Sequence, residues 1–371
     1  MQTVLIDTYY HKVAPAGIKT YIEQLVKGCK NSDSNHINYI YSSEIKCDRK
    51  KPSVLNSSNR LLRWTFQINY FIWKQLILPF KCLIHNIDIL ICPDYILPIW
   101  NLKAKKIVVL HDSLFWNHPE YYTLLWRYYY LNLISFGIDK KTIIVTTSEY
   151  SKKTLKKVLN IENEIKVIYQ SCSKNTGKFS IKTNKKNIIH VGSFEERKNL
   201  IILLKAFLKI KSDKNNNQLK LVLAGSTNFF GQNKELKKIK KFIAENNLYN
   251  EVKITNYLSN EKIQKLYSSA FLYVFPSNEE GFGIPIIESF TNGVPVICSD
   301  LEVFREIGKD SILTFKQNDS DDLSSKIEFL IKSDNKRLEL IKKGFQRIKY
   351  FSNEKFINSF EKLFKSSNFN V

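Results

Sequence analysis

The chain contains the stretch Pro276-Ser-Asn-Glu-Glu-Gly-Phe-Gly-Ile-Pro-Ile-Ile-Glu-Ser289, which runs from an apolar segment into an amphipathic one. This pattern predicts a turn from a strand into a helix. Gly281 and Gly283 would let the backbone turn tightly and approach a ligand, and Pro285 suits the first turn of a helix. The free N–H groups and the positive dipole end of that helix predict a phosphate-binding turn.

Two carboxylates flank this turn. Glu280 lies in the loop and Glu288 about a turn into the helix, so both can face one ligand that spans the loop. The alternative is a glycine-rich turn with one solvated glutamate and no ligand. The dinucleotide-binding G-x-G-x-x-G fingerprint is excluded, because it would need glycine where Ile286 stands.

Outward from this turn, short β-branched runs alternate with longer amphipathic runs along almost the whole chain. In the second half the predicted strands are 187–191, 220–223, 252–255, 272–275 and 294–298, and the predicted helices are 199–210, 233–245, 260–269 and 284–291. In the first half the predicted strands are 4–7, 37–41, 88–92, 107–110, 143–146 and 167–168, and the predicted helices are 18–30, 120–136 and 149–159. Such alternation indicates βαβ units and parallel sheets.

The predicted fold class is therefore α/β, with two doubly wound, Rossmann-like domains that face a central cleft, the natural place for a ligand. The N-terminal domain is expected over residues 1–170 and the C-terminal domain over 187–350. The polar stretch 171–186 between them is typical of a linker. Residues 351–371 are predicted to form a helix that packs back toward the first domain.

The composition is that of a globular protein, with 371 residues of which 43% are hydrophobic and 25% charged; a disordered chain is excluded. Lys and Arg outnumber Asp and Glu by 57 to 35, a net charge of +22. This excess suggests a nucleic acid, a phosphorylated small molecule or an anionic membrane as partner, or else a compositional bias toward lysine. The cysteine spacing fits neither a zinc site nor a disulfide framework, and neither a signal peptide nor a spanning helix is expected.

Further candidates lie at the ends of predicted strands, where open α/β sheets carry functional groups. Arg197 and Lys198 are adjacent cations placed for a diphosphate, although a solvated loop pair is the alternative. His111 follows the strand at 107–110, where a structural histidine is the alternative. Gly17 opens the first predicted helix, and a glycine there lets the backbone come close to an anion.

Together these windows resemble the retaining glycosyltransferases of family 4, which have the GT-B fold, and the resemblance spans nearly the whole chain. The run from Glu280 to Glu288 is similar to the E-x7-E motif of that family. Four more segments resemble its recurrent motifs: Val191-Gly-Ser-Phe-Glu-Glu-Arg-Lys-Asn-Leu, Gly17-Ile-Lys-Thr-Tyr, His111-Asp-Ser-Leu-Phe-Trp-Asn-His-Pro-Glu and Thr147-Ser-Glu-Tyr-Ser-Lys.

The resemblance implies a role for each matching residue. Glu288 would hold the ribose hydroxyls, and Glu280 the hydroxyls of the donor hexose. Arg197 and Lys198 would bind the diphosphate, and His111 the sugar. The backbone N–H groups that would complete the cradle are those of Gly17, Phe282, Gly283 and Ile284.

Two departures from the family pattern bear on these roles. Ser193 stands where many members carry an arginine, so one phosphate contact would either be missing or be supplied by Arg197. Tyr169-Gln-Ser171 replaces the usual Pro-Asn-Gly of the hinge. No cofactor and no metal are expected, since the nucleotide sugar is a substrate and the D-x-D spacing at 319–321 precedes a helical run, where helix capping is favoured.

One segment of the first half mixes basic and aromatic residues. The run from Arg60 to Lys74 contains Arg60, Arg63 and Lys74 among aromatic and aliphatic side chains, as a membrane-surface helix would. A core helix is the alternative. The +22 charge adds to the expectation that these cations bind an anionic surface.

The function predicted from the sequence is a retaining glycosyltransferase that moves a hexose, with mannose from GDP-mannose as best guess, to a hydroxyl of a lipid-linked or oligosaccharide acceptor in bacterial O-antigen or capsule synthesis. The expected partners are a GDP- or UDP-linked sugar, the glycan or lipid-linked acceptor and an anionic membrane surface. The expected location is cytoplasmic or peripheral at the inner face of the membrane. The alternatives are a same-fold sugar-nucleotide enzyme such as an epimerase, or a basic nucleic-acid-binding protein. The second alternative is contradicted by the absence of any helix-turn-helix, RNP-like or zinc pattern in the sequence.

Overall fold

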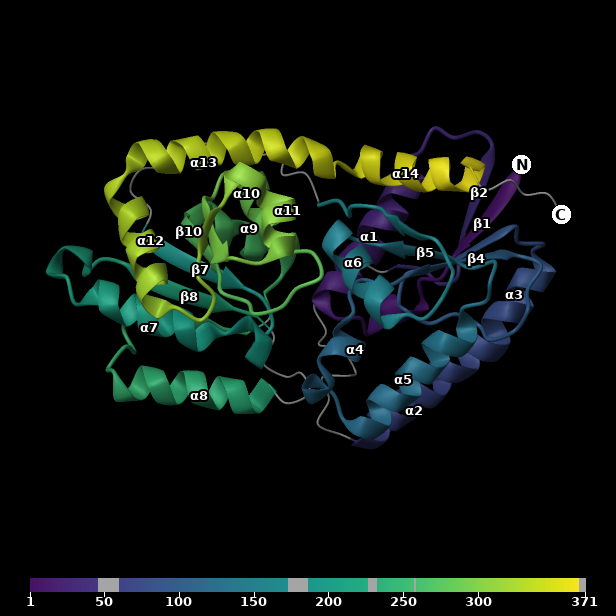
Figure 1. Ribbon diagram of the computed structural model, residues 1–371, viewed down its shortest axis with the longest axis horizontal. Coiled ribbons are helices and arrows are strands. Elements are labelled where there is room, and N and C mark those ends of the chain that lie inside the picture. The colour runs from purple at the N-terminus through teal and green to yellow at the C-terminus, as the bar shows by residue number, and fades with distance from the viewer. Residues whose placement is uncertain (46–59, 173–185, 226–231, 257, 367–371) are drawn as a thin grey trace. The chain divides into compact units, whose positions relative to one another are not determined.

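The computed structural model describes residues 1–45, 60–172, 186–225, 232–256 and 258–366. These residues divide into two compact domains. The first contains residues 1–45, 60–172 and 351–366, and the second contains the described residues between 186 and 350. Each has one six-stranded sheet with helices on its faces (Figure 1), which confirms the predicted pair of doubly wound α/β units.

The sheet of the first domain is parallel throughout, in the order β2-β1-β3-β4-β5-β6. Its strands are β1 (Gln2–Ile6), β2 (Ile37–Tyr41), β3 (Ile89–Cys92), β4 (Lys105–Val109), β5 (Ile143–Thr146) and β6 (Ile165–Val167). Successive side chains point to opposite faces of a strand. Accordingly, Leu5 joins the apolar cluster on one face, whereas Val4 and Ile6 join the cluster on the other.

The first domain contains the α-helices α1 (Ala16–Lys30), α2 (Arg60–Ile72), α3 (Leu78–Ile84), α4 (Leu114–Asn117), α5 (Leu124–Gly137), α6 (Glu149–Val158) and α14 (Asn353–Ser366). The π-helix η3 (Trp73–Ile77) joins α2 to α3, and η1 (Tyr9–Lys12) and η4 (Pro119–Tyr121) are 3₁₀ turns. Tyr70 and Leu78, from the α2–η3–α3 helix, and Ile134 from α5 pack in the cluster of Leu5. Phe356 and Phe360 of α14 pack with Val4 on the other face, so the end of the chain belongs to the core of the first domain.

The sheet of the second domain is also parallel, in the order β12-β11-β10-β7-β8-β9. Its strands are β7 (Asn187–Val191), β8 (Lys220–Ala224), β9 (Val252–Thr255), β10 (Ala270–Phe275), β11 (Val296–Ser299) and β12 (Leu313–Phe315). Its α-helices are α7 (Leu200–Lys211), α8 (Gln232–Glu245), α9 (Asn260–Ser269), α10 (Ile284–Thr291), α11 (Glu302–Gly308), α12 (Ser320–Lys332) and α13 (Asp334–Arg347). Four 3₁₀ turns accompany them: η5 (Glu196–Lys198), η6 (Lys214–Asn216), η7 (Lys309–Ser311) and η8 (Ile348–Phe351).

Three of the differences between the structure and the sequence predictions bear on the fold or the site. β12 was not predicted, because three residues are too few to show a period. The helix expected over 120–136 begins only at Leu124, after the 3₁₀ turn η4 and the extended residue Thr123. Lys74 was expected at a membrane surface, but its side chain is 1% exposed, so the assignment of Lys74 to a surface contact is wrong.

The α2–η3–α3 helix is the longest continuous helical segment of the first domain, but its charged and polar residues interrupt its apolar character. Of the residues that the structure describes, none belongs to a helix that is both long and apolar enough to cross a bilayer.

Candidate functional site

The two loops that carry the predicted acidic and basic residues follow neighbouring strands of the second sheet. β7 ends at Val191 and β10 at Phe275, and these parallel strands are paired. The strand order reverses between them, because the chain winds from β7 to β9 on one side and from β10 to β12 on the other. Open α/β sheets bind ligands beyond the carboxyl ends of their strands at such a reversal.

Hydrogen bonds tie these two loops together. The Asn278 N–H donates to the carbonyl oxygen of Arg197 at 2.7 Å. The side-chain amide of Asn199 donates to Oδ1 of Asn278 at 3.1 Å. Asn199 has a φ of 52°, a left-handed conformation that asparagine tolerates better than most residues. The loops therefore hold their functional side chains in one fixed arrangement.

Glu280 is the centre of that arrangement. Its Oε1 atom pairs with Nζ of Lys198, lies 3.1 Å from Nη1 of Arg197 and accepts a hydrogen bond from Ser277 Oγ at 2.9 Å. The side chain is 11% exposed. Burial acts to raise the pKa of Glu280, but Lys198 and Arg197 outweigh it and hold the pKa at about 2. Glu280 is therefore ionised at neutral pH and suited to accept hydrogen bonds from hydroxyl groups, not to donate a proton.

Arg197 is fixed by a second carboxylate. Its Nε atom lies 2.7 Å from Oε2 of Glu195, whose other oxygen accepts a hydrogen bond from Ser193. Burial acts to raise the pKa of Glu195, but the cations of Arg197 and Lys198 lower it below its ordinary value. Two cations and two carboxylates thus make a cluster without net charge, in which Ser193 donates a hydrogen bond to Glu195.

Glu288 lies on α10 and accepts a hydrogen bond from the phenol of Tyr267 at 3.0 Å. The charges of both glutamates act on the pKa of the buried Tyr273. Burial raises the pKa of Tyr273 well above its ordinary value, and the charges of Glu288 and then of Glu280 raise it further. The charges of both carboxylates therefore reach the same buried side chain of the second domain.

The turn between Glu280 and α10 requires glycine at one position. Gly283 has a φ of +110° and precedes α10. A Cβ atom there would lie 3.2 Å from Ile286 and 3.3 Å from Phe304. Phe282 is buried beside it and Ile284 begins the helix, so the three predicted cradle residues are the last two of the turn and the first of α10.

His111 lies in the first domain, at the end of β4. Its Nε2 atom is 2.9 Å from the carbonyl oxygen of Pro93, and its ring packs against Tyr21 and Tyr95. A carbonyl oxygen only accepts, so Nε2 carries the proton and Nδ1 is left as an acceptor. Burial lowers the pKa of His111 to about 4, which keeps the ring neutral at neutral pH.

Gly17 belongs to the first turn of α1, the helix that supplies Tyr21 to the His111 ring. A Cβ atom on Gly17 would meet nothing within 4 Å. Packing therefore does not require glycine there, and its lack of a side chain leaves open space at the start of the helix.

Sequence reasoning missed several parts of this arrangement. Glu195 and Ser277 stand in the quoted windows, and their polarity beside the predicted residues was a usable signal. Tyr267 and Tyr273 come from α9 and β10, and neither sequence spacing nor composition relates them to Glu288. Only the pairing of the elements brings them together.

The acidic groups that could suggest a metal site have other partners. Asp319 caps α12 by accepting from the N–H groups of Asp321 and Asp322, as the capping interpretation predicts. Within the described residues, Asp7, Cys92 and Asp94 form a cluster of possible ligands. The ammonium of Lys74 already lies 2.7 Å from Asp7 and 2.6 Å from Asp94, so a cation of the protein itself already pairs with both carboxylates.

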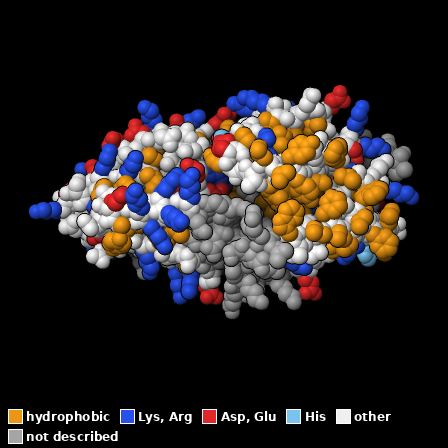
Figure 2. All heavy atoms as spheres, turned by 90° about the horizontal axis from the view of Figure 1, so that it is seen from below, with side chains coloured by type: hydrophobic (Ala, Val, Ile, Leu, Met, Phe, Trp, Pro, Cys, Tyr) orange, Lys and Arg blue, Asp and Glu red, His pale blue; other side chains and the backbone are white. Residues whose placement is uncertain are grey.

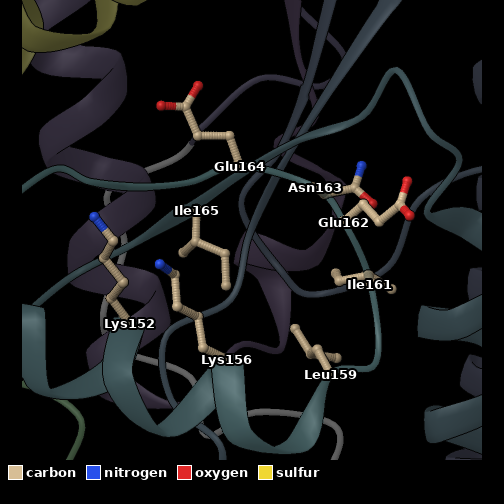
Figure 3. A pocket seen from close by; sticks show the side chains of 8 residues that line it. All are labelled: Lys152, Lys156, Leu159, Ile161, Glu162, Asn163, Glu164 and Ile165. Atoms are coloured by element: carbon tan, nitrogen blue, oxygen red, sulfur yellow. The ribbon is translucent and has the colours of Figure 1, made fainter.

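A separate hollow lies beside α6 and β6 in the first domain (Figure 3). Its lining includes the ammonium groups of Lys152 and Lys156 and the carboxylates of Glu162 and Glu164. None of the residues predicted for the site lines this hollow, and its lining carries both positive and negative charges. The hollow is therefore not a better candidate for the functional site than the two loops of the second domain.

The chain matches the family model of Glycosyl transferases group 1 over residues 173–347. It is 27% identical over 229 residues to the O-antigen chain mannosyltransferase RfbU of Salmonella typhimurium, in an alignment that covers 61% of each chain. It is 24% identical over 273 residues to the O-antigen chain mannosyltransferase B of Escherichia coli, covering 70% of this chain and 69% of that protein. The chain thus spans about three fifths to two thirds of the length of these relatives.

Among solved structures, the chain is similar to Anabaena HepE in complex with UDP-glucose. The TM-score is 0.71 at 16% identity, and the match covers 99% of this chain and 100% of the other. At this identity the likeness shows the fold alone. The predicted GT-B fold is confirmed.

Proposed function

We propose, from the match of residues 173–347 to the family model of Glycosyl transferases group 1, that the chain moves a hexose from a nucleotide sugar to a hydroxyl of a lipid-linked or oligosaccharide acceptor, with retention at the anomeric carbon. The observation that carries this proposal is the ionised Glu280, held by Arg197 and Lys198 at the strand reversal of a group 1 domain.

The chemistry of this site suits transfer driven by positioning and charge. Glu280 accepts hydrogen bonds from hexose hydroxyls through its carboxylate, and Glu288 does the same for the ribose. As the bond from the anomeric carbon to the diphosphate breaks, negative charge gathers on the leaving oxygen. Arg197, Lys198 and the start of α10 would stabilise that charge. The acceptor hydroxyl then bonds to the anomeric carbon on the face that the diphosphate leaves, and its proton passes to the departing diphosphate oxygen.

A bound diphosphate would compete with the carboxylates of the site for the two cations. The two cations pair with Glu280 and Glu195 in the structure. A diphosphate that binds nearby competes for the same guanidinium and ammonium protons. Glu280 is thereby released toward the sugar hydroxyls, which couples binding of the diphosphate to positioning of the hexose.

The finer identity of the substrates is part of this proposal. GDP-mannose is the preferred donor, supported by the two O-antigen mannosyltransferases among the relatives. UDP-linked sugars are the alternative, since HepE is solved with UDP-glucose. Neutral His111, with an accepting Nδ1, would bind a donor-sugar hydroxyl. The reaction needs no metal or cofactor in this scheme, and it would take place in the cytoplasm or at the inner face of the membrane, where a lipid-linked acceptor is found.

A thermal-shift panel of nucleotide sugars tests the donor. A ligand at roughly 100 times its dissociation constant stabilises a protein by about 2.7 kcal/mol, so the true donor should raise the melting temperature more than other nucleotide sugars. The reaction itself is tested by the release of nucleoside diphosphate. Release that requires an added acceptor supports transfer, whereas conversion of the sugar without an acceptor supports an epimerase. Salt-sensitive binding of an oligonucleotide with no protection by any nucleotide sugar would support the nucleic-acid alternative.

A further inference from the structure

The surface charge of the second domain attracts anions without distinguishing one from another. Figure 2 shows Lys and Arg side chains spread over this domain, on the left of the view. The summed field of such charges draws in a diphosphate whichever nucleoside it carries. Hydrogen-bonding groups at fixed positions, by contrast, reject a ligand that lacks the matching group. Recognition of the nucleoside therefore has to come from fixed groups inside the domain.

Glu288 is held in place from the buried side of its carboxylate. The phenol of Tyr267 donates a hydrogen bond to Oε2 of Glu288 at 3.0 Å. Tyr267 is completely buried, whereas Glu288 on α10 is only half-buried. The phenol therefore approaches the carboxylate from the interior of the domain, and a ligand that reaches Glu288 arrives from the side of the solvent.

This hydrogen bond restricts a side chain that would otherwise move. A glutamate turns about three side-chain bonds and loses that freedom when a ligand fixes it. A buried donor that fixes the carboxylate beforehand reduces the entropy lost on binding, so the ligand binds more tightly. A bond from a phenol to a charged carboxylate is also stronger than one between neutral groups. The Tyr267 hydroxyl thus prepares Glu288 for a ligand.

Tyr267 is itself rigid, because both its backbone and its ring have fixed neighbours. It lies where α9 meets β10, and the N–H of Ala270 donates to its carbonyl oxygen. Its ring centroid is 6.1 Å from that of Tyr273, whose phenol donates to the carbonyl oxygen of Val191 at 3.3 Å. The ring of His190 stacks on Tyr273 in turn. These three buried rings hold the Tyr267 phenol in one place.

We propose that Tyr267 is a positioning residue, which aims the Glu288 carboxylate at the ribose hydroxyls and so sets the preference of the site for a nucleoside diphosphate with both the 2′ and the 3′ hydroxyl. The proposal rests on the proposed function, in which Glu288 binds the ribose. Tyr267 acts through Glu288, at the nucleoside end of the donor. Binding of the donor therefore depends on Tyr267, and the chemical step does not.

The substitution Tyr267→Phe tests this role, because it keeps the ring and removes only the hydroxyl. Isothermal calorimetry with GDP and with UDP, each against its 2′,3′-dideoxy form, gives the ribose preference, defined as the ratio of the two affinities. The variant should bind the ribonucleotide about tenfold more weakly, as expected for the loss of a hydrogen bond to a charged group. Its affinity for the dideoxy form should equal that of the wild type, which also shows that the variant is folded.

Two controls separate positioning from support of the fold. Tyr273→Phe removes a neighbouring buried phenol that donates to a backbone carbonyl, and it should leave the ribose preference unchanged. In a Glu288→Ala background, Tyr267→Phe should have no further effect on the ribose preference, because no carboxylate is left to position. In steady-state transfer, Tyr267→Phe alone should raise KM for the nucleotide sugar about tenfold and leave kcat near the wild-type value.

The role of Tyr267 is overturned if Tyr267→Phe keeps the ribose preference of the wild type, if Tyr273→Phe lowers that preference equally, or if the effect of Tyr267→Phe persists without Glu288. In each of these cases the wild type still binds a nucleotide, so the proposed function stands. A wild-type chain that binds neither GDP nor UDP, nor any nucleotide sugar, would overturn the proposed function together with this role.

Discussion

The ammonium of Lys198 pairs with the carboxylate of Glu280, although 82 positions of sequence separate the two residues. The pair joins the loop after β7 to the loop after β10, which are neighbours only because the second sheet reverses its strand order there. A buried ion pair is costly to break on one side, since the remaining charge is left without a partner. The pair is therefore both a link between the two loops and the means by which Glu280 stays ionised.

The two glutamates should have separable effects on binding and turnover. Glu288→Ala should weaken the binding of the bare nucleoside diphosphate by about 1.5–3 kcal/mol, the contribution of a hydrogen bond to a charged group. Glu280→Ala should mainly lower kcat, because its partner is the reacting hexose, which the bare nucleotide lacks. Isothermal calorimetry and steady-state kinetics measure the two effects. Equal losses of nucleotide affinity in both variants would contradict the assignment.

Acid should destabilise the second domain through Glu280. The pKa of this carboxyl is about 2 in the folded chain against an ordinary value of 4.5. A group with a depressed pKa stabilises the fold above its unfolded value, and this contribution is lost as the pH falls toward the folded value. The difference in unfolding free energy between wild type and Glu280→Gln should therefore shrink between pH 4.5 and about 2. Urea titrations at a series of pH values measure it, with Glu245→Gln on the exposed side of α8 as the control. A difference that stays constant through this range would show that Glu280 is not held ionised.

Gly283 and Gly17 should respond differently to alanine. Gly283→Ala places a Cβ at a φ of +110° and within 3.3 Å of Phe304, so we expect a loss of stability of about 1–3 kcal/mol together with lower activity. Gly17→Ala adds a methyl group to open space and should leave the melting temperature unchanged. If the Gly17 backbone approaches the ligand as predicted, KM should rise in that variant. Unchanged kinetics in Gly17→Ala would remove Gly17 from the site.

Lys74 should be essential for the stability of the first domain. Burial and the neighbouring Asp7 charge raise the pKa of Asp94 to about 6 even though Lys74 acts to lower it. Lys74→Met removes the one ammonium that two buried carboxylates share and should cost about 3–5 kcal/mol. The further substitutions Asp7→Asn and Asp94→Asn should recover part of that loss by removing the stranded charges. Urea unfolding of the full chain gives the comparison; a triple variant no more stable than Lys74→Met would contradict this electrostatic account.

Local pattern and spacing in the sequence determined most of the fold. The alternation of β-branched and amphipathic runs depends on periodicities that each segment carries by itself, so the strands from 4–7 to 294–298 could be predicted without knowing their partners. The glycines and carboxylates of the stretch 276–289 likewise predicted the turn and carried the resemblance to family 4. The strand β12 was not predicted, because a segment of three residues is too short to show a period. The π-helix η3 was not predicted either, because one extra residue in a helical turn does not change the composition of the segment.

The tertiary structure alone decided which groups neutralise one another. The sequence places Arg197 and Lys198 in one loop and Glu280 in another, and it offers each as a free ligand-binding group. Their pairing depends on the strand order, which brings the carboxyl ends of β7 and β10 together. The sequence also did not show that the Lys74 side chain is buried, because a lysine among aromatic residues is typical of an interfacial helix. Only the folded chain brings Asp7 and Asp94, from the ends of two adjacent strands, beside its ammonium. Periodicity is a property of one segment, whereas charge compensation in a buried site requires groups from several segments to meet, and only the folded chain makes them meet.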